Sequence, residues 1–164
     1  MLRLLLNCLT AVALIFGGHF SSDCHPKKSC GFGFIFKLGI GAGNVLNTFK
    51  GSFTRDLIDD SPVIVRMKLT DAEMNIILKK MQEINFFDYP DSFKISGTAH
   101  VMPSEKHSYE VKCEKLTKKL YWDDCIRAPN AQAENLRELS RLIWQMIKSK
   151  PEFKKLPKPR GGYY

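Results

Sequence analysis

The stretch from Pro62 to Asp91 constrains the fold most, because a strand pattern runs directly into an amphipathic helix. Thr70 and Glu73 form a capping-box pair that marks the start of this helix. Its apolar residues recur at helical spacing along one face: Met74, Ile77, Leu78, Met81 and Ile84. An aromatic run before Pro90 ends the helix and is expected to join the core. Such a stripe must be buried, so the segment predicts a helix packed on a β-sheet.

Three strands are predicted ahead of this helix. Phe32 to Ile40 is rich in aromatic and β-branched residues, and Val45 to Gly51 is the returning strand after a glycine-rich turn. The polar segment Arg55 to Ser61 is expected to contain a turn, followed by a third strand from Val63 to Leu69. A dinucleotide-binding loop would continue into a helix after its glycines, whereas a strand follows here.

The second half of the chain predicts a hairpin and a second helix. The hairpin arms are Ser108 to Val111 and Leu120 to Trp122, with the turn between Leu116 and Lys119. The helix begins at Pro129 and ends near Ser149, with an apolar stripe of Leu136, Leu139, Leu142, Ile143, Met146 and Ile147. The sequence therefore predicts an α+β fold, an antiparallel sheet in the order β-β-β-α-β-β-α with both helices on one face.

The chain divides into three parts. Residues 1–22 carry Arg3 and then an apolar run from Leu4 to Phe16, which is shorter than the roughly 20 apolar residues of a membrane span. We interpret them as an export signal peptide, so the protein is expected to be periplasmic, outer-membrane-associated or secreted. Residues 23–150 form a single α+β domain, and residues 151–164 form a basic tail containing proline and glycine.

The cysteines fit an exported protein. Phe20 to Cys24 resembles a lipobox, which makes Cys24 a lipidation candidate, although Asp23 departs from the small residue usual before the cysteine. The disulfide candidates are Cys24, Cys30, Cys113 and Cys125. We expect Cys113 and Cys125 to be oxidised, either to each other or with Cys30 bonded to one of them. Their spacing does not match that of zinc ligands, and no metal or cofactor is expected.

Two histidines and two carboxylates are the candidates for catalysis. His100, Glu105 and His107 fall in or beside a predicted loop, where we expect exposed side chains. Asp123 and Asp124 follow the second hairpin arm and, as neighbours, are expected to point in opposite directions. His100 or His107 with Asp123 or Asp124 would be a general acid–base pair if folding brought them together.

Three segments of the chain resemble a family of uncharacterised domains found in bacterial exported proteins and lipoproteins. The resemblance runs from about Phe32 onward through RMKLTDAEMNIILKKMQEINFFDYPD, LYWDDC and NLRELSRLIWQMIKSKPEFKKLPKPRGGYY. It implies a fold and an exported location without an activity. No catalytic residue is implied by it.

Two functions are open from the sequence. The leading hypothesis is a non-enzymatic binding module that contacts a protein or a cell-surface component through its sheet face or its basic tail. The formal net charge of +8 agrees with an anionic partner, but for an exported chain we do not expect nucleic acid to be that partner. Membrane attachment would come from an N-terminal lipid on Cys24. The alternative is a hydrolase that uses a loop histidine and a carboxylate.

Overall fold

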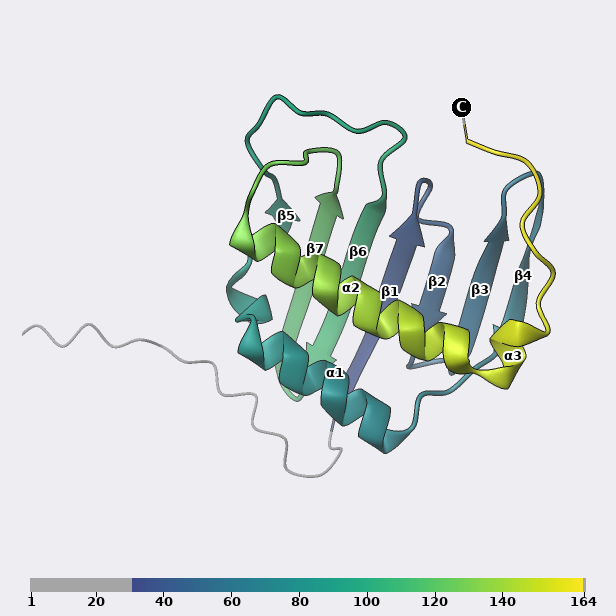
Figure 1. The fold of residues 1–164 in the computed structure, drawn as a ribbon. Coiled ribbons are helices and arrows are strands. Elements are labelled where there is room, and N and C mark those ends of the chain that lie inside the picture. Colours follow the sequence, from purple (N-terminus) through teal and green to yellow (C-terminus); the bar gives the residue numbers. More distant parts are fainter. Residues whose placement is uncertain (1–30, 164) are drawn as a thin grey trace, which may run out of the picture.

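The computed structural model describes residues 31–163, which form one β-sheet with helices on one face (Figure 1). The predicted signal peptide, Cys24 and Cys30 lie outside the described residues. Both long helices cross the same side of the sheet, which confirms the α+β class and the one-sided layer of helices. Within the described part, no helix is long and apolar enough to cross a membrane.

Seven strands make up the sheet in the order β4-β3-β2-β1-β6-β7-β5. They are β1 (Phe32–Gly39), β2 (Asn44–Asn47), β3 (Ser52–Leu57), β4 (Asp60–Arg66), β5 (Ser92–Phe93), β6 (Lys106–Cys113) and β7 (Leu116–Asp123). The helices are α1 (Asp71–Glu83), the 3-10 helix η1 (Phe86–Asp88), α2 (Ala131–Ser149) and α3 (Pro151–Lys154). Every neighbouring pair is antiparallel except β5 and β7, which run parallel.

The prediction of three strands before α1 was wrong by one strand. The polar segment that was expected to be a turn supplies the end of β3 and the beginning of β4, and β4 ends at Arg66 rather than Leu69. Arg55 interrupts the apolar–polar alternation expected of a strand. Its guanidinium carbon lies 4.4 Å from the centre of the Phe153 ring. The side chain therefore takes the place of an apolar residue on the helix-covered face.

The predicted hairpin forms, but with a different register. Its turn consists of Glu114 and Lys115, and Glu114 adopts the left-handed conformation with φ of 53°. Cys113 therefore faces Leu116, and Trp122 faces His107. Because the turn is shorter than predicted, both strands are longer than the predicted arms, and His107 lies within β6.

Each of the two long helices begins at a residue whose side chain caps its first turn. The Thr70 hydroxyl accepts the Glu73 amide at 3.2 Å while the Glu73 carboxylate accepts the Thr70 amide at 2.7 Å, which confirms the capping box. α2 begins after Asn130, whose side chain accepts the Ala133 amide at 2.9 Å, and not at Pro129. The apolar stripes of both helices supply much of the core, together with Phe86 and Tyr89 after α1.

The other face of the sheet is covered by no helix of the described residues (Figure 1). One cross-strand row on this face runs through Ile64, Thr54, Val45, Lys37, Ser108 and Tyr121. Ile64 and Tyr121 are exposed there, and the Phe49 ring lies where a Cβ on Gly33 would point. This face is therefore mixed in polarity.

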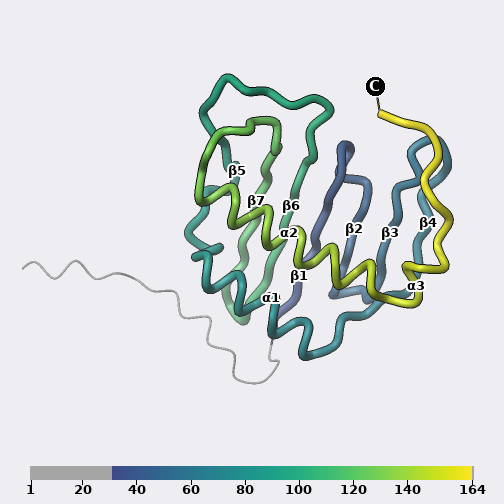
Figure 2. Tube along the Cα trace, in the orientation of Figure 1, coloured from purple at the N-terminus to yellow at the C-terminus, as the bar shows by residue number. Residues whose placement is uncertain are grey.

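The predicted tail is held against the domain over most of its length. Pro151 opens the short helix α3, and the Phe153 ring packs against the rings of Phe53 and Trp144. Further along, the Arg160 amide donates to the Leu57 carbonyl at 3.3 Å, and its guanidinium bonds both oxygens of Asp60. Figure 2 shows this yellow segment running back along the β3 and β4 side of the sheet.

Candidate functional site

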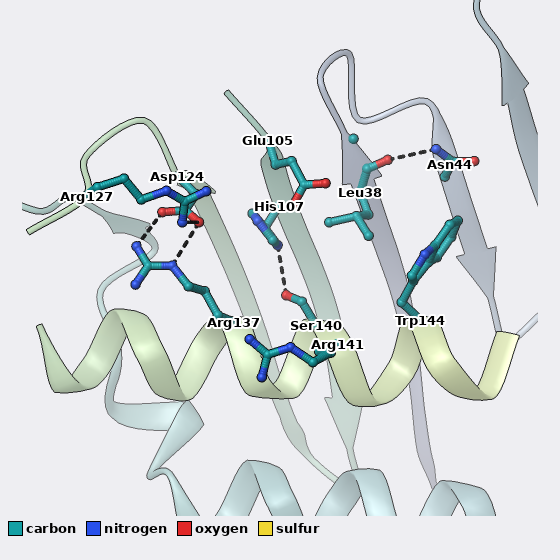
Figure 3. A pocket seen from close by; sticks show the side chains of 11 residues that line it. Leu38, Asn44, Glu105, His107, Asp124, Arg127, Arg137, Ser140, Arg141 and Trp144 are labelled. Carbon is teal, nitrogen blue, oxygen red and sulfur yellow. Dashed lines mark hydrogen bonds and ion pairs between the residues drawn. The ribbon is translucent and has the colours of Figure 1, made fainter. Parts of the chain in front are cut away.

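A pocket of about 330 Å³ opens between α2 and the sheet, where β1 ends and β6 begins. Figure 3 shows side chains from both strands and from α2 converging on it. Its lining residues are Leu38, Gly39, Asn44, Glu105, His107, Asp124, Arg127, Arg137, Ser140, Arg141 and Trp144. It combines a few apolar walls with several convergent polar groups, as ligand pockets do.

A buried hydrogen-bond cluster forms the floor of this pocket. His107 and Tyr109 are buried and alternate with half-buried positions on β6, so both point toward α2. The His107 Nδ1 atom lies 2.8 Å from the Ser140 Oγ atom, and the Tyr109 hydroxyl lies 2.5 Å from the same Oγ. Ser140 also donates to the Leu136 carbonyl at 2.9 Å. The cluster ties β6 to the middle of α2.

His107 is neutral at physiological pH. It is only 2% exposed, and its ring stacks on Trp122 with the ring centres 4.7 Å apart. Burial lowers the pKa of His107 to about 4; Asp124 opposes this decrease, and the charges of Arg137 and Arg127 add to it. Its Nε2 atom is buried and has no hydrogen-bond partner among the described residues.

Asp124 is buried and held by two arginines. Arg137 bonds its carboxylate in a bidentate manner, with Nε 2.9 Å from Oδ2 and Nη2 2.6 Å from Oδ1. Arg127 adds a bond from Nη1 to Oδ2 at 2.8 Å. The hydrogen bond to Asp124 is the main reason that the pKa of Arg137 is raised. The carboxylate therefore accepts bonds from the arginines and none from His107.

The mouth of the pocket carries guanidinium groups that reach solvent. The side chains of Arg127 and Arg141 are 47% and 57% exposed. Arg141 forms an ion pair with Glu134 at 3.7 Å, a distance longer than that of a hydrogen bond. With His107 neutral, the lining holds three arginines against the carboxylates of Glu105 and Asp124, so it is positive by one charge.

The structure brings the four catalytic candidates together in two pairs, each in its own pocket. His107 and Asp124 line this pocket, but the expectation that His107 is exposed in a loop was wrong, because β6 begins at Lys106 and buries it. His100 and Asp123 instead line a second pocket of about 340 Å³, together with Cys125 and apolar side chains. The neighbouring aspartates thus belong to different pockets.

The expectation that both Cys113 and Cys125 are oxidised was wrong for Cys125, which excludes the pairing of these two cysteines with each other. Cys113 is disulfide-bonded, whereas Cys125 carries a free thiol. Cys113 lies at the turn of the β6–β7 hairpin, while Cys125 follows Asp123 at the opposite end. The partner of Cys113 is not among the described residues, so pairing with Cys30 or Cys24 stays a prediction.

Sequence reasoning missed the residues that α2 contributes. Ser140 lies in the apolar stripe, four residues after Leu136. Arg137 and Arg141, which are four residues apart, lie on either side of it in the sequence. A serine in such a stripe indicates a buried polar partner on the facing element. Within residues 31–163, no group of three or more His, Cys, Asp or Glu side chains is placed to hold a metal ion.

No protein-family model matches the sequence, and no curated protein matches it. The resemblance to bacterial exported domains therefore stays a prediction.

Proposed function

We propose that this protein is an exported, non-enzymatic binding module that holds an anionic ligand between Arg127 and Arg141 at the mouth of the His107 pocket. The observation that carries the proposal is the pair of half-exposed guanidinium groups above a rigid, buried polar floor. A guanidinium presents its N–H donors as a planar fork that matches a carboxylate or phosphate. The pocket carries the proposal, rather than the sheet face or the tail, because its polar groups converge on one volume.

The arginines of the pocket favour binding because neighbouring residues hold them in position before a ligand arrives. Asp124 orients Arg137 and Arg127, and the Arg137 guanidinium carbon lies 5.4 Å from the centre of the Trp122 ring. The opposite face of the pocket is bounded by Trp144, which packs on Phe53. Groups held in place before the ligand arrives lose little conformational entropy when it binds.

A hydrolase is the second candidate, because Ser140 Oγ lies 2.8 Å from a histidine nitrogen in a pocket that also contains a carboxylate. Three features disfavour it. Ser140 is 4% exposed and its Oγ has three polar neighbours. A histidine with a pKa of about 4 is a weak general base at neutral pH. Asp124 is engaged by arginines and does not orient His107.

Fluorophosphonate labelling followed by peptide mass spectrometry separates the two functions. We expect no adduct on Ser140 in the folded protein. An adduct that disappears in Ser140→Ala would favour the hydrolase and contradict the proposed function.

The binding proposal itself is tested with a simple aromatic acid, 3-phenylpropionate, titrated into ¹⁵N-labelled protein and followed by NMR. We expect shifts at Arg141 and at residues lining the pocket. Arg141→Gln should weaken binding about 10-fold or more, since a hydrogen bond to a charged group is worth about 1.5–3 kcal/mol. Lys148→Gln is the matched control, because it removes one positive charge from the same helix at an exposed position outside the pocket. Equal weakening by both variants, or no binding at all, would refute the proposal.

A further inference from the structure

The hydrogen bonds around Ser140 determine which nitrogen of His107 carries the proton. Among the described residues, the Tyr109 hydroxyl has Ser140 Oγ as its hydrogen-bond partner, so it donates its proton there. The single proton of Ser140 can then go to the Leu136 carbonyl or to His107 Nδ1. In the first case, Nδ1 must itself be protonated and donate to Oγ.

The first arrangement is the better one on two counts. It forms three hydrogen bonds at Oγ, whereas protonation of Nε2 leaves the Leu136 contact without a proton. It also leaves a lone pair, rather than an N–H, on the buried and unpartnered Nε2. Orphaned buried N–H groups are rarer in proteins than under-used acceptors.

We propose that His107 turns the lone pair of Nε2 toward the pocket and that the pocket therefore selects an acid carrying a hydroxyl or amine donor beside its anionic group, such as a 2-hydroxy acid. This inference rests on the proposed function and names the ligand class of the same site. His107 and Arg141 line the same pocket, so a small ligand can place its donor against one and its anionic group against the other.

Figure 3 shows that the nitrogen not bonded to Ser140 points away from α2, between Asp124 and Glu105. Nε2 is buried, whereas the lining side chains of Glu105 and Arg127 reach solvent. Trp144 lines the pocket and offers an apolar surface to the remainder of the ligand.

The tautomer is measured directly on the wild-type protein without a ligand. Ring ¹⁵N chemical shifts of His107 at neutral pH should show a protonated Nδ1 and an unprotonated Nε2. A protonated Nε2 would overturn the inference while leaving the proposed function intact.

Ligand selection is measured with two acids that differ by one hydroxyl, 3-phenyllactate and 3-phenylpropionate. We expect the hydroxy acid to bind about 3- to 10-fold more tightly, the range for one neutral hydrogen bond. His107→Phe removes the acceptor while keeping an aromatic ring on Trp122, and it should make the two affinities equal. If that variant does not fold, the wild-type comparison and the tautomer measurement decide.

The outcomes separate the inference from the proposed function. Equal affinity of the two acids, with binding still sensitive to Arg141→Gln, overturns the inference alone. Failure of both acids to bind overturns the proposed function and the inference with it.

Discussion

Burial of a neutral histidine makes the stability of this fold depend on pH. The pKa of His107 is lowered by burial to about 4, against an ordinary value of 6.5. Between these values the unfolded chain binds a proton that the folded chain excludes, so stability rises with pH across this window. We expect His107 to cost on the order of 3 kcal/mol of stability at pH 4 relative to pH 7. Urea unfolding from pH 4 to pH 7 measures this difference.

His107→Gln is the control for that measurement, because glutamine does not titrate. Its stability should depend less on pH between 4 and 7 than that of the wild type. Parallel pH profiles for the two proteins would show that other groups govern the acid sensitivity.

The two arginines that hold Asp124 should differ in their importance for stability. Arg137 bonds the buried carboxylate twice and its side chain is 16% exposed, whereas Arg127 bonds it once and is about half exposed. Arg137→Gln leaves a buried charge short of partners and should cost about 3–5 kcal/mol. Arg127→Gln should cost about 1 kcal/mol or less. Denaturant midpoints compare the two variants, and equal losses would contradict this division of roles.

Individual residues of the site were only partly predictable. His107 and Asp124 were candidates by residue type alone, but their meeting depends on the two-residue turn at Glu114 and Lys115, which sets the register of the whole hairpin. Ser140 and Arg137 were not predicted as site residues, since their partners come from β6 and the segment after β7. Contacts of this kind have no local signature in a sequence.

Among the elements, α1 provides a test that needs only one residue type. Ile76 and Ile77 are neighbours, yet Ile76 is 51% exposed and Ile77 is 0% exposed. Ile77→Ala should destabilise the fold by roughly 2–5 kcal/mol, because it removes packed atoms from the core. Ile76→Ala should change stability by about 0.5 kcal/mol or less. Urea melts of both variants measure the contrast, and similar losses would mean that the helix presents another face to the sheet.

The elements that could be predicted are those whose pattern is purely apolar and whose ends carry a cap. α1 satisfies both conditions, and its capping box is present. β3 satisfies neither condition, because Thr54, Arg55 and Asp56 form its centre. Arg55 packs on Phe153 from α3, which lies nearly a hundred residues later in the sequence. A tertiary contact of that range overrides local propensity.

For the molecule as a whole, export remains a prediction from residues 1–22. We expect the mature chain to begin between Gly18 and Cys24, because the apolar run is followed there by small and polar residues. Mass spectrometry of the native N-terminus measures this, and it also reveals a diacylglycerol-sized addition if Cys24 is lipidated. A chain that keeps residues 1–16 would contradict the predicted location.

The cysteines give a second prediction at this scale. Cys113 pairs across the sheet with Phe32, and Cys30 precedes Phe32 by two residues in the sequence. We therefore expect non-reducing peptide mapping to join Cys30 to Cys113, while Cys125 reacts with an alkylating reagent in the folded protein. A peptide joining Cys24 to Cys113 would show that the other N-terminal cysteine is the partner.

The central place of β1 in the sheet has a consequence for how the protein is assembled. β1 pairs on one edge with β2, the next strand in the sequence. Its other edge pairs with β6, which is synthesised only after α1, β5 and a long loop. A chain that emerges N-terminus first thus holds an open, hydrogen-bonding edge in the middle of its future core. Until Lys106–Cys113 arrives, the same edge from another nascent copy is a competing partner. We therefore expect crowding of nascent chains, more than instability of the finished sheet, to promote aggregation of this protein.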